Sequence, residues 1–170
     1  MTTHTFYIGM GSNAPDAEAQ LATARQLLAD RTCARLWFST PVLTAPIDFP
    51  HPALFANQVA LCEAAVEPSA LRQLLKDIER TMGRLPWHKR EGRVVIDLDL
   101  LSTDGRVCRR ADWCRPYVRD GVSELEGQRR ALAGYSACGA ASGSDAGSDL
   151  GASGFSSSSA TSSTPTNSSM

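Results

Sequence analysis

Two aspartates stand two positions apart in an otherwise apolar segment, Val-Val-Ile-Asp-Leu-Asp-Leu-Leu. If this segment is a strand, Asp97 and Asp99 project from the same face about 7 Å apart, because side chains alternate between the faces of a sheet. Two carboxylates this close repel each other and lose hydration, so a cation is expected beside them. Mg²⁺ binds through one or two carboxylates and completes its coordination with water and phosphate oxygens. The pair therefore predicts a magnesium site, and a solvated sheet face with two ordinary acids is the alternative.

Four basic residues precede the acids in a polar segment: Arg84, Lys89, Arg90 and Arg93. Guanidinium groups bind phosphate oxygens bidentately, and a loop that closes over a site excludes water and strengthens such contacts. Cations beside a metal site therefore indicate a polyphosphate ligand. A solvated basic loop is the alternative, but the neighbouring acid pair favours ligand binding.

Other common chemistries lack their motifs. The Gly9-Met10-Gly11 segment has Ala14 where a dinucleotide-binding fingerprint needs its third glycine, and no Gly-x-x-x-x-Gly-Lys loop occurs. The three histidines and five cysteines are scattered, without Cys-x-x-Cys pairs or zinc-ligand spacing. The sequence therefore favours neither Rossmann or Walker nucleotide binding nor structural zinc, and it predicts a reduced, cytoplasmic protein.

The acids need a sheet to present them, and hydrophobic spacing predicts one. Extended segments are expected at residues 5–10, 36–39, 54–62 and 94–101, and helices at residues 15–30 and 68–82. A proline-rich loop joins the second and third strands, an Asp104-Gly105 turn predicts a hairpin, and residues 112–132 have weak helical spacing. The order of these elements predicts an α+β sandwich with a ferredoxin-like βαββαβ sheet and two helices on one face.

Composition divides the chain into a domain at residues 1–134 and a tail at residues 135–170. The tail contains 13 serines and no lysine or arginine, which predicts a disordered segment without a site. The whole chain carries 17 basic and 18 acidic residues, for a net charge of −1. This balance predicts no nucleic-acid or membrane partner. The first residues also lack the basic and apolar stretches of a signal peptide, as expected for a cytoplasmic protein.

Four short segments, taken together, carry a resemblance over residues 5–101. They are Tyr7-Ile8-Gly9-Met10-Gly11-Ser12-Asn13, Ser39-Thr40-Pro41, Phe55-Ala56-Asn57, and Ile78-Glu79 through Gly83-Arg84 to Ile96-Asp97-Leu98-Asp99. In order and spacing they resemble the 6-hydroxymethyl-7,8-dihydropterin pyrophosphokinase family. These folate-pathway enzymes move pyrophosphate from ATP to a pterin alcohol.

The resemblance implies roles for individual residues. Asp97 and Asp99 would hold two Mg²⁺ ions that bridge the ATP phosphates and the substrate hydroxyl. Phe55 would stack on the pterin ring and Asn57 would hydrogen-bond its edge, since an aromatic face with a few polar groups suits a planar heterocycle. For Phe55, core packing is the alternative that spacing alone favours.

Four further positions follow from the same resemblance. Thr40 and Leu43 would line the pterin pocket through backbone groups. Glu79 and Arg84 match family positions near the nucleotide.

The chain departs from the family pattern just before the acids. The family commonly has an arginine three residues before the first aspartate, where this chain has Val94 and the arginine is Arg93. Adjacent strand residues point to opposite faces, so Arg93 reaches the phosphates only if the end of the loop bulges. We expect Arg84 and Arg93 to act as catalytic cations, and Lys89 and Arg90 to bind nucleotide as substitutes.

A second departure lies downstream of the acids. The family's Pro-His-Pro segment, with a phosphate-contacting histidine and a second stacking phenylalanine, is replaced by residues 112–117. Trp113 or Tyr117 is the candidate for the second aromatic wall. We predict a monomeric ATP- and Mg²⁺-dependent pyrophosphokinase whose partners are two small molecules, ATP and the pterin alcohol. The alternatives are a pterin- or nucleotide-binding module that has lost catalysis and, if neither ligand binds, an unassigned interaction domain.

Overall fold

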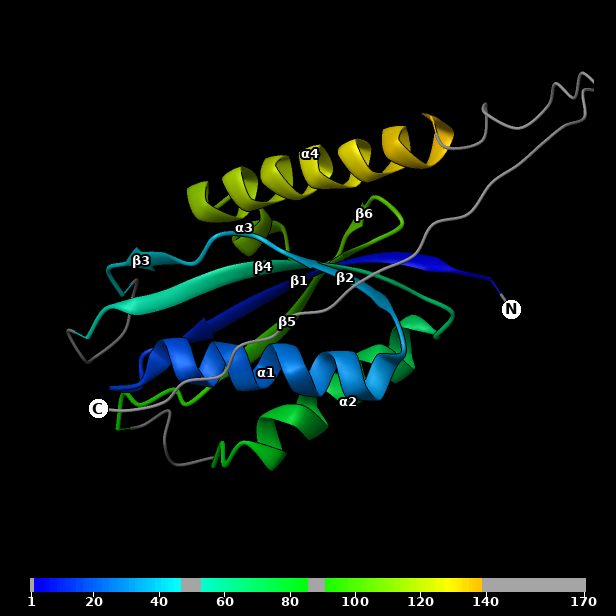
Figure 1. Ribbon diagram of the computed structural model, residues 1–170. Coiled ribbons are helices and arrows are strands. Elements are labelled where there is room, and N and C mark those ends of the chain that lie inside the picture. The colour runs from blue at the N-terminus through cyan, green and yellow to red at the C-terminus, as the bar shows by residue number, and fades with distance from the viewer. Residues whose placement is uncertain (1, 47–52, 86–90, 139–170) are drawn as a thin grey trace, which may run out of the picture.

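The computed structural model of the protein describes residues 2–46, 53–85 and 91–138, and a central antiparallel sheet lies between two layers of helices (Figure 1). The strands are β1 (His4–Ser12), β2 (Arg35–Phe38), β3 (Val42–Thr44), β4 (Phe55–Ala64), β5 (Asp97–Thr103) and β6 (Arg106–Val107). The helices are α1 (Ala17–Thr32), α2 (Pro68–Thr81), α3 (Arg110–Trp113) and α4 (Pro116–Cys138).

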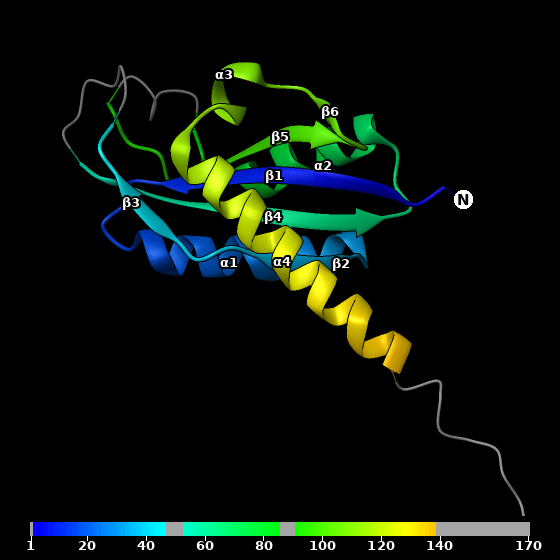
Figure 2. The same cartoon turned by 90° about the horizontal axis from the view of Figure 1, so that it is seen from above.

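The sheet has the strand order β2-β4-β1-β5-β6, and β3 pairs with β4 beside β2. Every pairing is antiparallel. Strands β1, β2, β4 and β5 with helices α1 and α2 form the βαββαβ unit that the sequence predicts, so the α+β class is confirmed. Helices α1 and α2 cover one face of the sheet, and α3 and α4 lie over the other (Figure 1). Seen from above, α4 crosses β1 and β4 obliquely (Figure 2).

Alternation along β1 separates two hydrophobic cores. Phe6, Ile8 and Met10 belong to the larger core beneath the sheet, which α1 and α2 cover. Tyr7 belongs to the smaller core beneath α4, whose other buried members are Val59, Leu61, Leu101, Val118 and Leu125. The next residues of β1 on this face are Gly9 and Gly11. Since glycine has no side chain, the smaller core ends there and leaves space over the sheet.

Helix α4 depends on close contact with the sheet. A β-carbon at Gly121 would lie 2.9 Å from Cγ2 of Val59 on β4, so only glycine allows the helix to approach this closely. The predicted helix at 112–132 is in fact two helices, because Pro116 begins a new one. Helix α4 continues to Cys138, four residues beyond the predicted domain boundary. Residues 139–170 lie outside the described residues.

The structure differs from the sequence prediction around two strands. The fourth strand was expected from residue 94 but begins at Asp97, and it extends to Thr103 in a hairpin with β6. Strand β3 lies inside the predicted proline-rich loop, as a three-residue segment pairing with the end of β4. Short edge strands of this kind tolerate flanking prolines, because their outer N–H groups need no partner.

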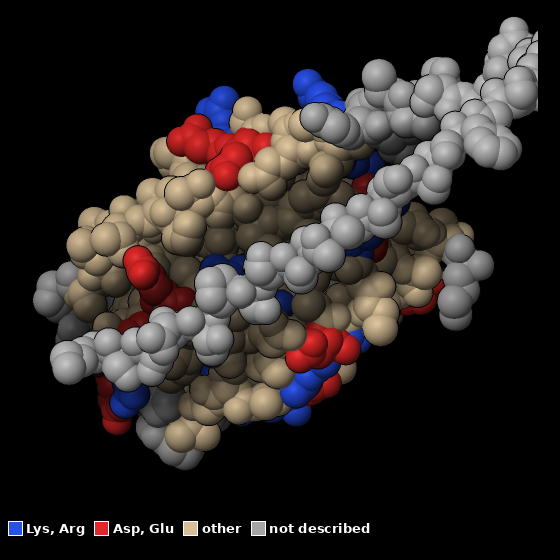
Figure 3. Space-filling model, in the orientation of Figure 1, with Lys and Arg blue, Asp and Glu red and all other residues tan. Residues whose placement is uncertain are grey.

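Among the described residues, no helix has the length and apolar character needed to cross a membrane. Where grey atoms do not cover the face in Figure 3, acidic and basic side chains are interspersed with uncharged surface. Neither sign dominates that face.

Candidate active site

Three residues on neighbouring strands form a row across one end of the sheet. Gly11 on β1 is aligned with Asn57 on β4 on one side and with Asp97 on β5 on the other. Strands lie about 4.8 Å apart, so the backbones of Asn57 and Asp97 are about 10 Å apart. Because Gly11 has no side chain, the space between the amide and the carboxylate stays open.

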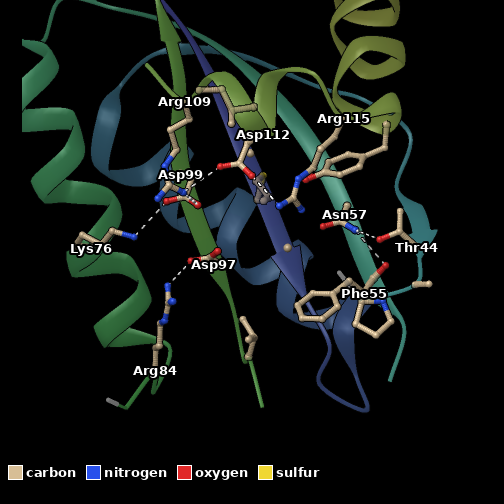
Figure 4. A pocket seen from close by; sticks show the side chains of 18 residues that line it. Thr44, Phe55, Asn57, Lys76, Arg84, Asp97, Asp99, Arg109, Asp112 and Arg115 are labelled. Carbon is tan, nitrogen blue, oxygen red and sulfur yellow. Dashed lines mark hydrogen bonds and ion pairs between the residues drawn. The ribbon is translucent and has the colours of Figure 1, made fainter. Parts of the chain in front are cut away.

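Gly9 has the same role two residues earlier on β1, where it is aligned with Asp99. Above these glycines lies a cavity of about 390 Å³. Figure 4 shows its two sides, with the β5 acids and their cationic partners on one and Asn57, Thr44 and Phe55 on the other. The cavity is lined by Gly9, Met10, Gly11, Thr44, Ala45, Pro46, Phe55, Asn57, Lys76, Arg84, Val94, Asp97, Asp99, Leu101, Arg109, Asp112, Arg115 and Tyr117.

Asp97 is paired with an arginine that follows α2. Nη1 of Arg84 lies 2.5 Å from Oδ1 of Asp97 and 2.7 Å from Oε2 of Glu79. Partial burial acts to lower the pKa of Arg84, but the charges of Asp97 and Glu79 outweigh it and raise the pKa above its ordinary value. Arg84 is therefore a permanent cation at the acid pair.

Asp99 has two cationic neighbours. The guanidinium of Arg109 bonds its Oδ2, and Nζ of Lys76 lies 3.7 Å from its Oδ1. Burial, followed by repulsion from Asp97, raises the pKa of Asp99, while Arg109 and Lys76 act in the opposite direction. This carboxylate is costly to keep charged without more positive charge nearby, as the sequence predicts for a cation site.

A buried glutamate connects α2 to the acid-bearing strand. Glu79 is 4% exposed, and its Oε1 accepts a 2.7 Å hydrogen bond from the backbone N–H of Leu98, which stands between the two aspartates. The same oxygen lies 2.7 Å from Nζ of Lys76. Glu79 thus holds strand β5 together with two cations, Lys76 on α2 and Arg84 just after it.

The turn after β1 holds the chain that leads into β5. The side chain of Asn13 accepts a 2.6 Å hydrogen bond from the backbone N–H of Val94 and donates a 2.9 Å bond to the carbonyl of Gly92. Ser12 donates to the carbonyl of Val94. These bonds position residues 92–94 just before the acids, which gives the Gly11-Ser12-Asn13 segment a structural role beyond ending a strand.

The opposite wall combines aromatic rings with an oriented amide. Nδ2 of Asn57 donates to Oγ1 of Thr44 at 2.8 Å, which orients the amide beside Phe55. Tyr117, at the start of α4, also lines the cavity, and burial raises the pKa of its hydroxyl. Tyr117 is thus the predicted candidate that lies in the cavity, whereas Trp113 packs edge-on against Tyr7, with ring centroids 5.6 Å apart.

Several predicted site residues lie elsewhere. Leu43 is 66% exposed, and Thr40 is bonded to Glu124 of α4 through its backbone N–H and its hydroxyl; neither lines the cavity. Arg93 is exposed and does not line the cavity, whereas Val94 does. The segment 86–90, with Lys89 and Arg90, lies outside the described residues.

Sequence analysis missed four charged residues of the cavity: Lys76, Arg109, Asp112 and Arg115. Lys76 was hidden because it lies on the polar side of a helix recognised by its apolar stripe. Asp112 and Arg115 lie in the segment 112–117 that departs from the family pattern, and Arg109 lies just before it; the signal there was the density of arginines after β6. Only the packing of α3 against β5 brings them to the acids.

The donor chemistry of the acid pair fits a divalent cation that keeps some ligands of its own. The described residues contain no group of three or more histidine, cysteine or acidic side chains placed to bind a metal. Two carboxylates on one open face, beside a cavity that water and phosphate can enter, are the ligand set that Mg²⁺ accepts and structural Zn²⁺ does not.

A second cavity, of about 470 Å³, lies along the β5 edge of the sheet. It shares Lys76, Asp99 and Arg109 with the first cavity and extends to Arg72 and Cys108. The two cavities therefore adjoin at these three residues, where Lys76 and Arg109 both pair with Asp99.

The structure is a small α+β protein whose main cavity has acids and cations on one side and an aromatic ring with an amide on the other, and comparison with known proteins identifies the class. The sequence profile of the family described as 7,8-dihydro-6-hydroxymethylpterin-pyrophosphokinase (HPPK) matches residues 7–127. The chain belongs to this family, whose reaction is pyrophosphoryl transfer in folate biosynthesis.

Three relatives bear the name 2-amino-4-hydroxy-6-hydroxymethyldihydropteridine pyrophosphokinase. The protein from Pseudomonas putida is 33% identical over 101 residues, which cover 59% of this chain and 83% of the relative. The one from Porphyromonas gingivalis is 31% identical over 132 residues, covering 70% of this chain and 88% of the relative. The one from Methylorubrum extorquens is 33% identical over 103 residues, covering 58% and 63%.

Proposed function

We propose that this chain transfers the pyrophosphoryl group of ATP to the hydroxymethyl oxygen of 6-hydroxymethyl-7,8-dihydropterin, and that the cavity over Gly9 and Gly11 is where this happens. The observation that carries the proposal is the row Asn57–Gly11–Asp97. This row supports a pocket for the pterin ring at Asn57 and a metal site at the acid pair, which face each other across the glycines of β1. Family membership supports the same reaction.

In this proposal the pterin lies against Phe55 and Tyr117, with its edge on the amide of Asn57. Aromatic faces stack on planar heterocycles. Nδ2 of Asn57 already donates to Thr44 and to the carbonyl of Phe55, so its oxygen is the group that accepts a hydrogen bond from the ring edge. The hydroxymethyl group then points across Gly11 toward Asp97. Thr40 and Leu43, which lie outside the cavity, have no direct role here.

ATP enters from the β5 edge. Its nucleoside lies in the second cavity, near Arg72, and its phosphates reach the first cavity past Asp99. Two cations, Lys76 and Arg109, line both cavities, and Arg84 lies beside Asp97 in the first. These positions support a role for all three as phosphate ligands. Arg84 keeps its predicted catalytic role, and Arg109 takes the one predicted for Arg93, because Arg109 lines the cavity and Arg93 does not.

The reaction forms one bond and breaks one. The hydroxymethyl oxygen attacks the β-phosphorus in line, the bond from the β-phosphorus to the oxygen shared with the α-phosphorus breaks, and AMP leaves with that oxygen. The hydroxyl proton is released to solvent. Arg84 and Arg109 stabilise the charge that develops on the phosphate oxygens, and the walls hold the two reactants in line.

Asp97 and Asp99 would hold two Mg²⁺ ions. When bound, these ions neutralise phosphate charge and make the acceptor hydroxyl more acidic. Their binding requires Arg84 and Arg109 to move from the carboxylates to the phosphates, which is a short displacement within the same cavity.

The test is a product analysis with purified protein, ATP, Mg²⁺ and the pterin alcohol. We expect AMP and the pterin diphosphate in equal amounts, seen by ³¹P NMR and mass spectrometry. ADP as the nucleotide product would contradict the proposal. Tight binding of both ligands without turnover would also contradict it, and would favour the alternative of a binding module that has lost catalysis. No feature of the described residues favours that alternative. A monomeric state and a cytoplasmic location stay predictions from the sequence.

A further inference from the structure

Three side chains around α3 form a chain of ion pairs at the edge of the cavity. Arg109 directly precedes α3, Asp112 lies within it, and Arg115 lies between α3 and α4. Oδ2 of Asp112 is 3.4 Å from Nη1 of Arg109, and its Oδ1 is 2.9 Å from Nη2 of Arg115. All three residues line the cavity, as Figure 4 shows.

Arg109 connects this group to the acid pair. The nitrogen that approaches Asp112 is also the one that bonds Asp99. Within the described residues, Arg109 is the one side chain paired with both an acid of β5 and Asp112. If Asp99 binds a metal, Arg109 loses one of its two carboxylate partners and keeps the other.

The position of Asp112 is unusual for a site that receives polyphosphate. Four cations and three carboxylates line the described part of the cavity, and two of the carboxylates are accounted for by metal binding. The third, Asp112, has a side chain only 24% exposed and adds negative charge where an anion must bind. By Coulomb's law alone it weakens nucleotide binding. Each of its oxygens, however, forms an ion pair with a different guanidinium, so it restricts two flexible side chains to the cavity wall.

On the basis of the function proposed above, we propose that Asp112 is a positioning residue for the nucleotide. Its carboxylate holds the guanidinium groups of Arg109 and Arg115 toward the phosphates, and it keeps Arg109 in the cavity after Asp99 has turned to a metal. Pre-oriented guanidinium groups lose less freedom on binding than free ones, which improves affinity without any contact between Asp112 and ligand.

The sign of the effect of Asp112→Asn tests the proposal. The probe is α,β-methylene-ATP, which cannot be cleaved at the reacting bond, and calorimetry is run with Mg²⁺ and again with EDTA. We expect binding about tenfold weaker with Mg²⁺, the loss typical of one charge-assisted hydrogen bond, and a smaller loss with EDTA, because Asp99 then still pairs with Arg109. Affinity for the pterin alcohol and the melting temperature stay unchanged. A role through charge alone predicts the opposite, tighter nucleotide binding.

Asp120→Asn is the matched control, because Asp120 is an exposed acid at the start of α4 that does not line the cavity. The Asp120→Asn substitution removes the same charge as Asp112→Asn, and we expect it to leave nucleotide binding unchanged or slightly tighter. Asp112→Glu keeps the charge with a longer reach and restores some of the affinity, which also covers the case in which Asp112→Asn lowers the melting temperature.

A double-mutant cycle shows whether Asp112 acts through its partners. In an Arg109→Gln background, Asp112→Asn should weaken binding by clearly less than it does in the wild type. The proposal is overturned if Asp112→Asn binds the nucleotide as tightly as the wild type or more tightly, if Asp112→Glu restores nothing, or if the effect is undiminished with both Arg109 and Arg115 replaced by glutamine. If the wild type itself neither binds ATP nor forms AMP, it is the proposed function that fails.

Discussion

Gly11 on β1 lies directly beneath the amide of Asn57 on β4: a β-carbon at Gly11 would lie 3.0 Å from Oδ1 of Asn57. That separation is too short for comfortable contact, so any side chain at Gly11 must displace the amide. The amide is held on its other side by Thr44. The missing side chain at Gly11 therefore leaves the space that the amide of Asn57 occupies, and we propose that this amide binds the pterin.

We predict that Gly11→Ala weakens binding of the pterin alcohol about fivefold to tenfold, because the displaced amide loses about one hydrogen bond to the ring. Affinity for α,β-methylene-ATP should change little. Calorimetry with each ligand measures both effects. Gly127→Ala is the control, since nothing lies within 4 Å of a β-carbon there. Unchanged pterin affinity in Gly11→Ala would show that the amide of Asn57 does not read the ring.

The sequence predicted the acid-bearing half of this site better than its surroundings. The spacing of Asp97 and Asp99 was enough to assign them to one face, since strand alternation is a local property. What Gly9 and Gly11 do there was not predictable, because their role depends on which strands pair with β1. Arg109 and Arg115 were missed for the same reason. Arg109 pairs with Asp99 and Arg115 with Asp112, and both reach the cavity through packing between segments that no local spacing encodes.

The fold was likewise predicted best where the signal lies in the local sequence. The stripe of leucines and isoleucine on α2 and the proline at its start defined that helix within a residue of its observed end. Helix α4 was less predictable, because some of its contact with the sheet is made by a glycine, which no hydrophobic pattern records. The start of β5 was misplaced because Val94 is buried without belonging to a strand; Asn13 holds it in place.

Two glycines on α4 should respond in opposite directions to the same substitution. Gly121→Ala forces a methyl group to within 2.9 Å of Val59, and overpacking of about 1–3 kcal/mol exceeds the gain of about 1 kcal/mol from better helix propensity. Gly127→Ala meets nothing and keeps the gain. Urea denaturation should therefore show a lower free energy of unfolding for the first variant and a higher one for the second. Equal shifts for both would mean that α4 does not pack as closely as described.

The buried carboxylate of Glu79 should matter far more to stability than an exposed one on the same helix. Glu79→Ala leaves the N–H of Leu98 without its partner and removes the charge shared by Lys76 and Arg84, so we expect a loss of about 3 kcal/mol in the free energy of unfolding. Asp77→Ala breaks an exposed pair with Arg80 and should cost less than about 1 kcal/mol. Comparable losses in the two variants would contradict the role assigned to Glu79.

Asp104 in the β5–β6 turn should give stability that depends on pH. A hydrogen bond from the backbone N–H of Thr5, and then one from His4, hold the pKa of this carboxyl below its ordinary value. A lowered pKa in the folded state means that the contribution is complete above the ordinary carboxyl pKa, about 3.9, and is lost as the pH falls below it. Asp104→Asn tolerates the positive φ of 48° at this position.

We therefore expect the urea midpoint of Asp104→Asn to lie below that of the wild type at pH 7, with the difference shrinking as the pH falls below about 4. Denaturation curves at matched pH values measure this difference. A difference that stays constant down to about pH 2 would show that the charge of Asp104 is not what anchors the N-terminal end of β1.

Counting bound Mn²⁺ by electron paramagnetic resonance, in the presence of α,β-methylene-ATP and the pterin alcohol, shows whether Asp97 and Asp99 hold the metal that brings ATP phosphates into the cavity. The wild type should hold two ions per chain. Asp97→Asn and Asp99→Asn should each lose at least one of them while keeping the melting temperature of the folded protein. Full occupancy in both variants would contradict the account.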